Sequence, residues 1–268
     1  MSELRLISLS SGSTGNCLYI EGGGAKILVD CGVTLKRASE GLKSLGVTPK
    51  DVDALLLTHE HSDHVKGAGY AAKYFGLQIY GNEATLEKAA PAIKKTGPAK
   101  GCFAAFENGA PFSVKGLVIR PFATSHDAAD PVGFVVSDGH SSIGVMSDTG
   151  CVTEGAAKAL AGCPCAYIEA NHDVEMLKSG PYPYSLKRRI LSASGHLSNA
   201  DSGEFIASLI RLGLKKVLLG HLSLENNRPL LAYETVEAVA SSHGMRRRVD
   251  YILGVAPHYE ASSPLSAN

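Results

Sequence analysis

The chain has 268 residues, of which 44% are hydrophobic and 19% are charged, which is ordinary for a globular α/β protein of one large domain or two small ones. Its formal net charge is zero, which excludes a global field that draws the chain to nucleic acid, so any such binding needs local basic patches. No apolar run approaches the roughly 20 residues of a membrane span, and the run Leu4–Leu9 is too short for a signal segment.

Short apolar runs separated by many glycines predict a chain rich in strands. The first part is expected to form strands at Leu4–Leu9, Cys17–Glu21 and Ala25–Val29, and a helix over Val33–Leu45. The next part is expected to form strand Val52–Thr58, helix Val65–Phe75, strand Leu77–Tyr80 and helix Glu83–Lys94. Strands then follow one another between Phe103 and Ser147, at Phe112–Val114, Leu117–Ala123, Val132–Ser137 and Ser142–Ser147.

The C-terminal part alternates between helices and strands. It is expected to contain helix Glu154–Ala161, strand Ala166–Glu169, helices Tyr184–Ser192 and Asp201–Leu212, strand Lys216–Gly220, helix Pro229–Ser242 and strand Tyr251–Gly254. No linker or low-complexity tract interrupts this order, so we expect a single domain over residues 1–268, in which residues 256–268 form a loose tail.

The segment THEHSDH, residues 58–64, contains four potential metal ligands directly after an apolar run. If that run is a strand, His59 and His61 point to the same side of the chain, and Asp63 and His64 fall in the turn beyond it. Three imidazoles and a carboxylate suit Zn²⁺, Fe²⁺ or Mn²⁺. The alternative is a chance cluster of histidines on a surface loop, but such spacing usually indicates a metal site.

Other potential ligands lie far along the chain and share one context, an apolar run that ends in a ligand-type side chain. Loops at strand ends are where α/β scaffolds place their chemistry. Six such ends on one chain suggest a shared edge, and two adjacent metal ions need more ligands than one short loop supplies. The six residues are Asp30, His59, His126, Asp148, Glu169 and His221.

The order of these ligand-type residues resembles that of the metallo-β-lactamase superfamily, over essentially the whole chain from Leu4 to about Gly254. The resemblance implies an α/β fold, a four-layer αββα sandwich with a dinuclear metal site on one edge. It implies that the first ion is held by His59, His61 and His126. It implies that the second is held by Asp63, His64 and His221, that Asp148 bridges the two, and that Asp30 orients a ligating histidine.

A metal pair of this kind predicts hydrolysis. Two divalent ions about 3.5–4 Å apart share a water whose pKa falls toward ~7. A carboxylate at the bridging position, here Asp148, is common in relatives that cleave phosphodiesters or thioesters, whereas many true β-lactamases have cysteine there and are exported. Zinc fits the number of histidines, and manganese or iron would also occupy mixed His/Asp ligands.

Two further motifs resemble those of the nuclease branch of the superfamily. They are YIEANHD around Glu169 and ASGHLSN around His196. Together with HLSLENN from His221 onward they are similar to the compact YycJ/WalJ group of exonucleases. The resemblance implies a 5′-to-3′ exonuclease of DNA in which His196 is the general acid and Glu169 holds its tautomer, with Asp63 counted as a third catalytic residue.

Alternatives to this interpretation remain open. His196 can instead cap a helix or contact a phosphate without proton transfer, and the strand end can simply expose Glu169. A hydrolase of a small phosphodiester or thioester would use the same metal site, and a binding protein could keep the site for structure alone.

The nucleic acid, expected to be DNA, needs a positively charged surface. Candidate patches are Lys187–Arg189, Arg211 with Lys215 and Lys216, and Arg246–Arg248, each of which is equally well a solvated face. The loop Ser10–Asn16 can offer backbone N–H groups to a phosphate or can be a plain hairpin connection. Six cysteines without a CxxC pair indicate reduced thiols and a cytoplasmic protein. No membrane partner is expected, and the sequence does not give the oligomeric state.

Overall fold

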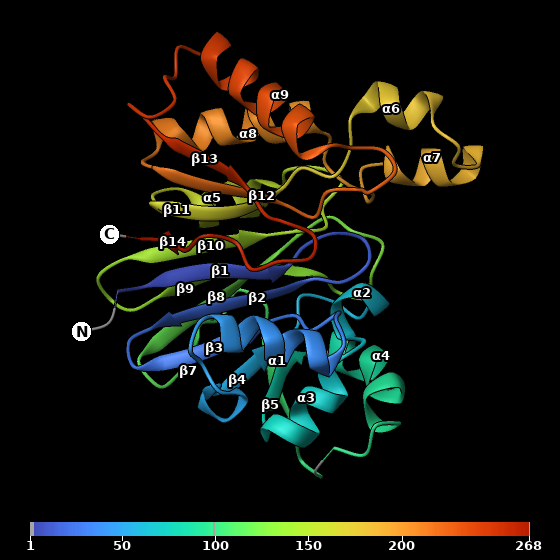
Figure 1. The fold of residues 1–268 in the computed structure, drawn as a ribbon, viewed down its shortest axis with the longest axis vertical. Helices are drawn as coiled ribbons and strands as arrows, with labels where there is room; N and C mark the ends of the chain where they lie inside the picture. Colours follow the sequence, from blue (N-terminus) through green and yellow to red (C-terminus); the bar gives the residue numbers. More distant parts are fainter. Residues whose placement is uncertain (1–2, 99, 268) are drawn as a thin grey trace.

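A computed structural model describes residues 3–98 and 100–267, which form two seven-stranded sheets packed face to face (Figure 1). The first sheet has the strand order β14-β1-β2-β3-β4-β5-β6 and the second β13-β12-β11-β10-β9-β8-β7. The first sheet contains β1 (Arg5–Ser10), β2 (Cys17–Gly22), β3 (Ala25–Val29), β4 (Ala54–Leu56), β5 (Gln78–Asn82), β6 (Phe103–Phe106) and β14 (Leu265–Ser266). The second contains β7 (Phe112–Val114), β8 (Leu117–Ala123), β9 (Val132–Ser137), β10 (Ser142–Met146), β11 (Cys165–Glu169), β12 (Lys216–Gly220) and β13 (Ile252–Val255).

Helices cover the outer face of each sheet, so the predicted four-layer αββα sandwich is confirmed. The first sheet is covered by α1 (Leu35–Ser44), α2 (Ser62–Val65), α3 (Ala68–Phe75) and α4 (Glu83–Lys94). The second is covered by α5 (Glu154–Leu160), α8 (Asn199–Arg211) and α9 (Pro229–Ser242). The pair α6 (Val174–Ser179) and α7 (Tyr184–Ile190) lies with α2 toward the side of the sandwich opposite the two termini (Figure 1). Within the described ranges, no helix is both long enough and apolar enough to cross a bilayer.

Several strands, among them β1, β3 and β4, are buried on both faces and are largely apolar. In β1, Leu6 belongs to the core between the sheets, whereas its neighbour Ile7 packs under the helices of the first sheet. In β4, Leu56 likewise belongs to the core between the sheets, and Leu55 packs under the helices. Successive side chains of a strand point to opposite faces, so a strand buried on both faces needs a continuous apolar run, as the sequence shows.

The topology brings distant strand ends to one edge. Strands β3 to β6 are parallel to one another, and so are β10 to β13. Strand β8 also runs in the direction of β10, since each is antiparallel to β9. The residues that follow β3, β4, β8, β10, β11 and β12 therefore lie at corresponding ends of their strands, as the sequence predicts.

Two helical segments differ from the prediction. The expected helix Val65–Phe75 is broken, because α2 ends at Val65 and α3 begins at Ala68. The break is at Gly67, whose N–H donates to the carbonyl of Cys31 and where a Cβ atom would lie 2.1 Å from the carbonyl oxygen of Val33. The sequence also gives no sign of the short helix α6, which is capped by Asp173.

The prediction of a loose tail at residues 256–268 is wrong for its described part, which ends at residue 267. Leu265 and Ser266 form β14 and pair with Leu6 and Arg5 of β1. The side chain of Leu265 is buried in the core between the sheets. The physical reason is that β1 would otherwise be an open edge, and an unpaired edge is covered by available chain.

Replacing Leu265 with alanine is expected to lower the free energy of unfolding by about 2–3 kcal/mol, because Leu-to-Ala changes in a core cost about 2–5 kcal/mol. Denaturant unfolding of the variant measures this change. The matched control is Leu230→Ala on α9, since Leu230 is 67% exposed. Equal stability of the two variants would show that the C-terminal segment is not part of the core.

Candidate metal centre

Three strand-end residues adopt a strained backbone that turns their side chains toward one edge of the sandwich. Asp30, Asp148 and His221 have φ angles of 59°, 51° and 53°. Left-handed backbone of this kind is uncommon for residues other than glycine and costs of order 1–3 kcal/mol. Such strain persists where the surrounding structure over-determines it, and it clusters at functional sites. These turns therefore indicate a built site.

The seven residues that the sequence predicts as metal ligands come together. In one group the nitrogens of three histidines lie within 4.8 Å of one another, and in another the same holds for two histidines and a carboxylate. The first group is His59, His61 and His126, and the second is Asp63, His64 and His221. Asp148 forms a further group with His59 and His64. The arrangement matches the division implied by the family resemblance, and this cluster can hold divalent ions.

Asp148 lies at the junction of the two groups. Its Oδ2 is 3.1 Å from Nε2 of His64, and its Oδ1 is 3.1 Å from Nε2 of His221. The same Oδ1 is 3.9 Å from Nε2 of His126, in the first group. The residue is 2% exposed. A buried carboxylate that faces members of both groups could contact ions held by either group.

Hydrogen bonds indicate which ring nitrogen of three of the histidines faces the centre. His64 donates from Nδ1 to Oδ2 of Asp30 at 2.8 Å, and His126 donates from Nδ1 to the carbonyl of Gly195 at 2.9 Å. Nδ1 of His221 lies 3.2 Å from Oδ1 of Asn16. In each ring the proton on Nδ1 leaves the lone pair on Nε2, directed at the centre, as in known histidine metal sites.

The donor set fits a cation on two observations. Nε2 of His59 is buried without a hydrogen-bond partner among the described residues, although its Nδ1 contacts Oγ1 of Thr58 at 3.0 Å. Nε2 of His126 faces Nδ1 of His61 at 3.2 Å, which places two ring nitrogens opposite each other. Buried polar atoms are normally satisfied, and a divalent ion accounts for all three nitrogens.

The protonation states agree with metal binding. Burial lowers the pKa of His59, His61 and His221, so these imidazoles are neutral at pH 7, which is the form that binds metal. Burial also opposes the charged form of His64, but the carboxylates around it, those of Asp148, Asp30 and Asp63, raise its pKa above the ordinary value. These carboxylates therefore favour positive charge beside His64, and a metal ion bound there takes the place of the proton that they stabilise.

The predicted catalytic pair is assembled beside this cluster. Nδ1 of His196 is 2.7 Å from Oε1 of Glu169, whose other oxygen accepts from the N–H of Thr149 at 2.9 Å. Burial raises the pKa of Glu169 to about 8 and lowers the pKa of His196. Since Nδ1 faces the carboxyl group, a proton shared by the pair leaves Nε2 of His196 as an N–H donor.

A cavity of about 210 Å³ opens over the cluster and is lined by His61, Asp63, His126, Asp148, His196 and His221. Seven further residues complete the lining. Four lie in segments that the sequence analysis singles out, namely Ser13, Asn171, Arg189 and Ser223. Sequence reasoning missed the other three, Tyr182, Leu186 and Ile190, which stand in no ligand-type motif, so no local signal marks them. The loop Ser10–Asn16 connects β1 to β2, and its Asn16 also contacts His221; the predicted contact of its backbone N–H groups with a phosphate stays a prediction.

The predicted basic patches are largely engaged within the protein. Arg189 lines the cavity, but its guanidinium pairs with Asp127, with Nη2 2.8 Å from Oδ1. Lys187 donates to the carbonyls of Lys178 and Gly180, at 2.7 Å each. Arg211 contacts His243, and Arg246 and Arg247 pair with Asp250 and Glu237. His172, three residues after Glu169 in the sequence, has no hydrogen-bond partner for either ring nitrogen in the described part of the chain.

Replacing Asp30 with alanine is expected to weaken metal binding about 10–100-fold, the usual cost of losing a carboxylate that orients a ligating histidine. Metal affinity is measured by competition with a chromogenic chelator, and circular dichroism checks that the variant is folded, since Asp30 also accepts from Thr58. Asp250→Ala, at a carboxylate paired with Arg246, is the matched control. Unchanged metal affinity in Asp30→Ala would exclude its orienting role.

Comparisons with known proteins bear on this geometry. The family model of the Metallo-beta-lactamase superfamily matches residues 11–160. The chain is 40% identical over 241 residues to Exodeoxyribonuclease WalJ of Streptococcus pneumoniae serotype 2 (strain D39 / NCTC 7466), covering 88% of each chain. It is 38% identical over 236 residues to Exodeoxyribonuclease YycJ of Bacillus anthracis, covering 88% of this chain and 89% of the relative. The crystal structure of the metallo-beta-lactamase fold protein YhfI from Bacillus subtilis matches with a TM-score of 0.73 at 19% identity. The match covers 97% of this chain and 99% of the YhfI chain, and it supports the fold alone.

Proposed function

Because the chain belongs to the metallo-β-lactamase superfamily, in the group that contains the WalJ and YycJ proteins, we propose that it is a metal-dependent phosphodiesterase that degrades DNA from the 5′ end. Both relatives are named as exodeoxyribonucleases. The observation that carries the proposal is the placement of the His196–Glu169 pair at the same cavity as the ligand cluster. In the proposed hydrolysis of a phosphodiester, the ligand cluster would hold the metal ions and the His196–Glu169 pair would supply the proton.

We assign two ions to the centre, since its ligand atoms fall into two groups that Asp148 joins. His59, His61 and His126 would hold one, and Asp63, His64 and His221 the other. Zinc suits this histidine-rich set best, and manganese or iron are the alternatives. When bound, such ions activate a water and stabilise the negative charge that builds on the phosphate.

The residues of the chain perform the rest of the reaction. His196 lines the cavity, and with Nδ1 engaged by Glu169 it donates a proton from Nε2 to the leaving oxygen of the scissile bond. Glu169 holds the ring through Nδ1 at 2.7 Å, so His196 is the general acid and Glu169 is its positioning residue. A positioned acid of this kind contributes typically 10²–10⁴-fold, because an alkoxide is a poor leaving group.

The cavity is small enough to select for a chain end. Its volume of about 210 Å³ accommodates a phosphate and part of a sugar, and Tyr182 and Leu186 of the segment around α7 form one wall. A single strand fits such a site better than a duplex.

The six cysteines are all free, which agrees with a reducing compartment and supports a cytoplasmic location.

A panel of strands tests the proposal. Purified protein is supplied with Zn²⁺, Mn²⁺ or Fe²⁺ in turn and given DNA and RNA strands of one sequence, with and without a 5′ phosphate and labelled at either end. We expect progressive shortening of DNA from the 5′ end, which depends on the metal. Turnover of a small diester or thioester without a response to competing DNA would instead favour a small-molecule hydrolase on the same fold.

A further inference from the structure

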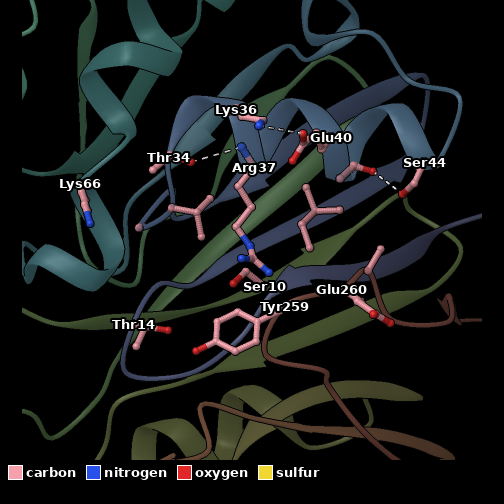
Figure 2. Close-up of a pocket in the computed structure, with 15 residues that line it drawn as sticks. Ser10, Thr14, Thr34, Lys36, Arg37, Glu40, Ser44, Lys66, Tyr259 and Glu260 are labelled. Atoms are coloured by element: carbon pink, nitrogen blue, oxygen red, sulfur yellow. Dashed lines mark hydrogen bonds and ion pairs between the residues drawn. The ribbon is translucent and has the colours of Figure 1, made fainter.

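A second cavity, about 620 Å³ in volume, lies between α1, the loop Ser10–Asn16 and the C-terminal segment. We call it the α1 cavity. Figure 2 shows Arg37 extending from α1 into it, toward Ser10 and Tyr259. None of the residues assigned above to the metals or to proton transfer lines it. We propose that the α1 cavity is a non-catalytic site that binds a phosphate group through Arg37 and Lys66.

The guanidinium of Arg37 is left with free donors. Its Nε is buried and has no hydrogen-bond partner among residues 3–98 and 100–267. Its Nη2 has a single recorded acceptor, the carbonyl of His258, at 3.5 Å, which is the outer limit of a hydrogen bond. A guanidinium carries five N–H donors, and an unpaired buried donor is costly. No carboxylate forms an ion pair with Arg37 in the described part of the chain, so the terminal N–H groups of its guanidinium are available to donate to an anion in the cavity.

Neighbouring side chains position the guanidinium of Arg37 for a ligand. The guanidinium carbon of Arg37 lies 4.9 Å from the centre of the Tyr259 ring, a cation–π contact that favours this position of the charge. Lys66 and Thr14 lie on one side of it in Figure 2, and the two acidic residues of the lining lie on the other. The Lys66 side adds a second cation and a hydroxyl donor. Planar, bidentate donors of this kind favour phosphate and carboxylate.

The acidic residues do not cancel this preference. Glu40 faces Lys36 on the same helix, with Oε1 3.9 Å from Nζ, and Glu260 is exposed to solvent. The lining thus contains three cations against two carboxylates. The first turn of α1, which carries Lys36 and Arg37, also adds the partial positive charge of a helix N-terminus.

We propose phosphate rather than carboxylate as the bound anion because the cavity adjoins the metal centre. Ser13 lines the metal cavity and its neighbour Thr14 lines the α1 cavity, so the two cavities lie against one loop. Lys66 follows the ligand His64 by two residues. A phosphate in the α1 cavity can belong to a DNA strand whose end is at the metals, or to a free nucleotide. Both sources present the same group to Arg37.

Binding measurements test this inference without turnover, so the result does not depend on the nuclease proposal. Metal-loaded protein is titrated with inorganic phosphate and dAMP by calorimetry, and with a labelled phosphorothioate DNA strand, which resists hydrolysis, by fluorescence anisotropy. The variants are Arg37→Gln and Lys66→Gln; Lys66 is exposed, so its replacement leaves the packing intact. Lys43→Gln, on the same helix but outside the lining, is the matched control for charge.

We expect Arg37→Gln to weaken phosphate binding about 10-fold or more, since hydrogen bonds to charged groups are the strong ones, and Lys66→Gln to weaken it less. Weaker binding of the DNA strand identifies the substrate strand as the source of the phosphate. Weaker binding of dAMP and inorganic phosphate, with DNA unchanged, identifies a free nucleotide. If both variants bind all three ligands as tightly as Lys43→Gln does, the proposed site does not exist.

Discussion

His196→Ala is expected to retain both metal ions and to hydrolyse DNA about 10²–10⁴-fold more slowly than the unchanged protein, which is the usual contribution of a positioned general acid. The ring of His196 contacts Glu169, and its distance to Asp148 is 3.7 Å from Nδ1, so its removal does not take away an assigned ligand. Steady-state rates on a 5′-phosphorylated strand, together with metal analysis, measure the effect.

A second substrate separates proton transfer from a structural role. A diester with a p-nitrophenol leaving group needs no proton, so His196→Ala should slow its hydrolysis far less than that of DNA. His243→Ala, at a histidine paired with Glu204, is the matched control and should leave both rates unchanged. An equal loss on the two substrates, or loss of metal, would rule out His196 as the general acid.

Asp148→Ala is expected to have the largest effect on the centre itself. The carboxylate faces Nε2 of both His64 and His221 at 3.1 Å, so its loss leaves the two ligand groups without a common member and with less negative charge. Metal ions contribute several kcal/mol of transition-state stabilisation to such reactions. Because each 1.36 kcal/mol in the activation free energy changes the rate tenfold, the rate of DNA hydrolysis should fall by about 10³-fold or more.

Metal content measured by plasma mass spectrometry and DNA hydrolysis are determined on the same Asp148→Ala sample. We expect fewer than two ions for each chain and activity near the background. The variant Asp250→Ala, remote from the cluster, should keep both. A variant at Asp148 that holds two ions and cleaves DNA at the normal rate would show that this carboxylate is not a bridging ligand.

Much of the fold is predictable from the sequence because many of the strands are buried on both faces. A continuous apolar run such as that of β12 has a clear beginning and end, and the predicted bounds Lys216–Gly220 agree with the structure. The strand-end context of His126 and His221 is equally local, since each follows its apolar run within a few residues. Parallel topology then converts these local signals into a shared edge, which is why residues from separated segments could be grouped in advance.

Features that depend on distant contacts were not predictable. The tail has no periodicity that marks Leu265 as a strand residue, because its partner Leu6 lies at the other end of the chain. The break at Gly67 depends on the backbone of Cys31 and Val33. The α1 cavity likewise needs Arg37 and Tyr259 together, and nothing near either residue in the sequence indicates the other.

The most direct test of the account is a metal titration of the metal-free protein with DNA hydrolysis as the signal. Zn²⁺ or Mn²⁺ is added in steps to a known concentration of chain while shortening of a 5′-phosphorylated strand is followed. We predict that hydrolysis is absent without metal and rises until two equivalents are bound, where it levels off. Hydrolysis that proceeds in the metal-free protein, or that never appears although two ions bind, would contradict the assignment of this cluster as the catalytic centre of a DNA exonuclease.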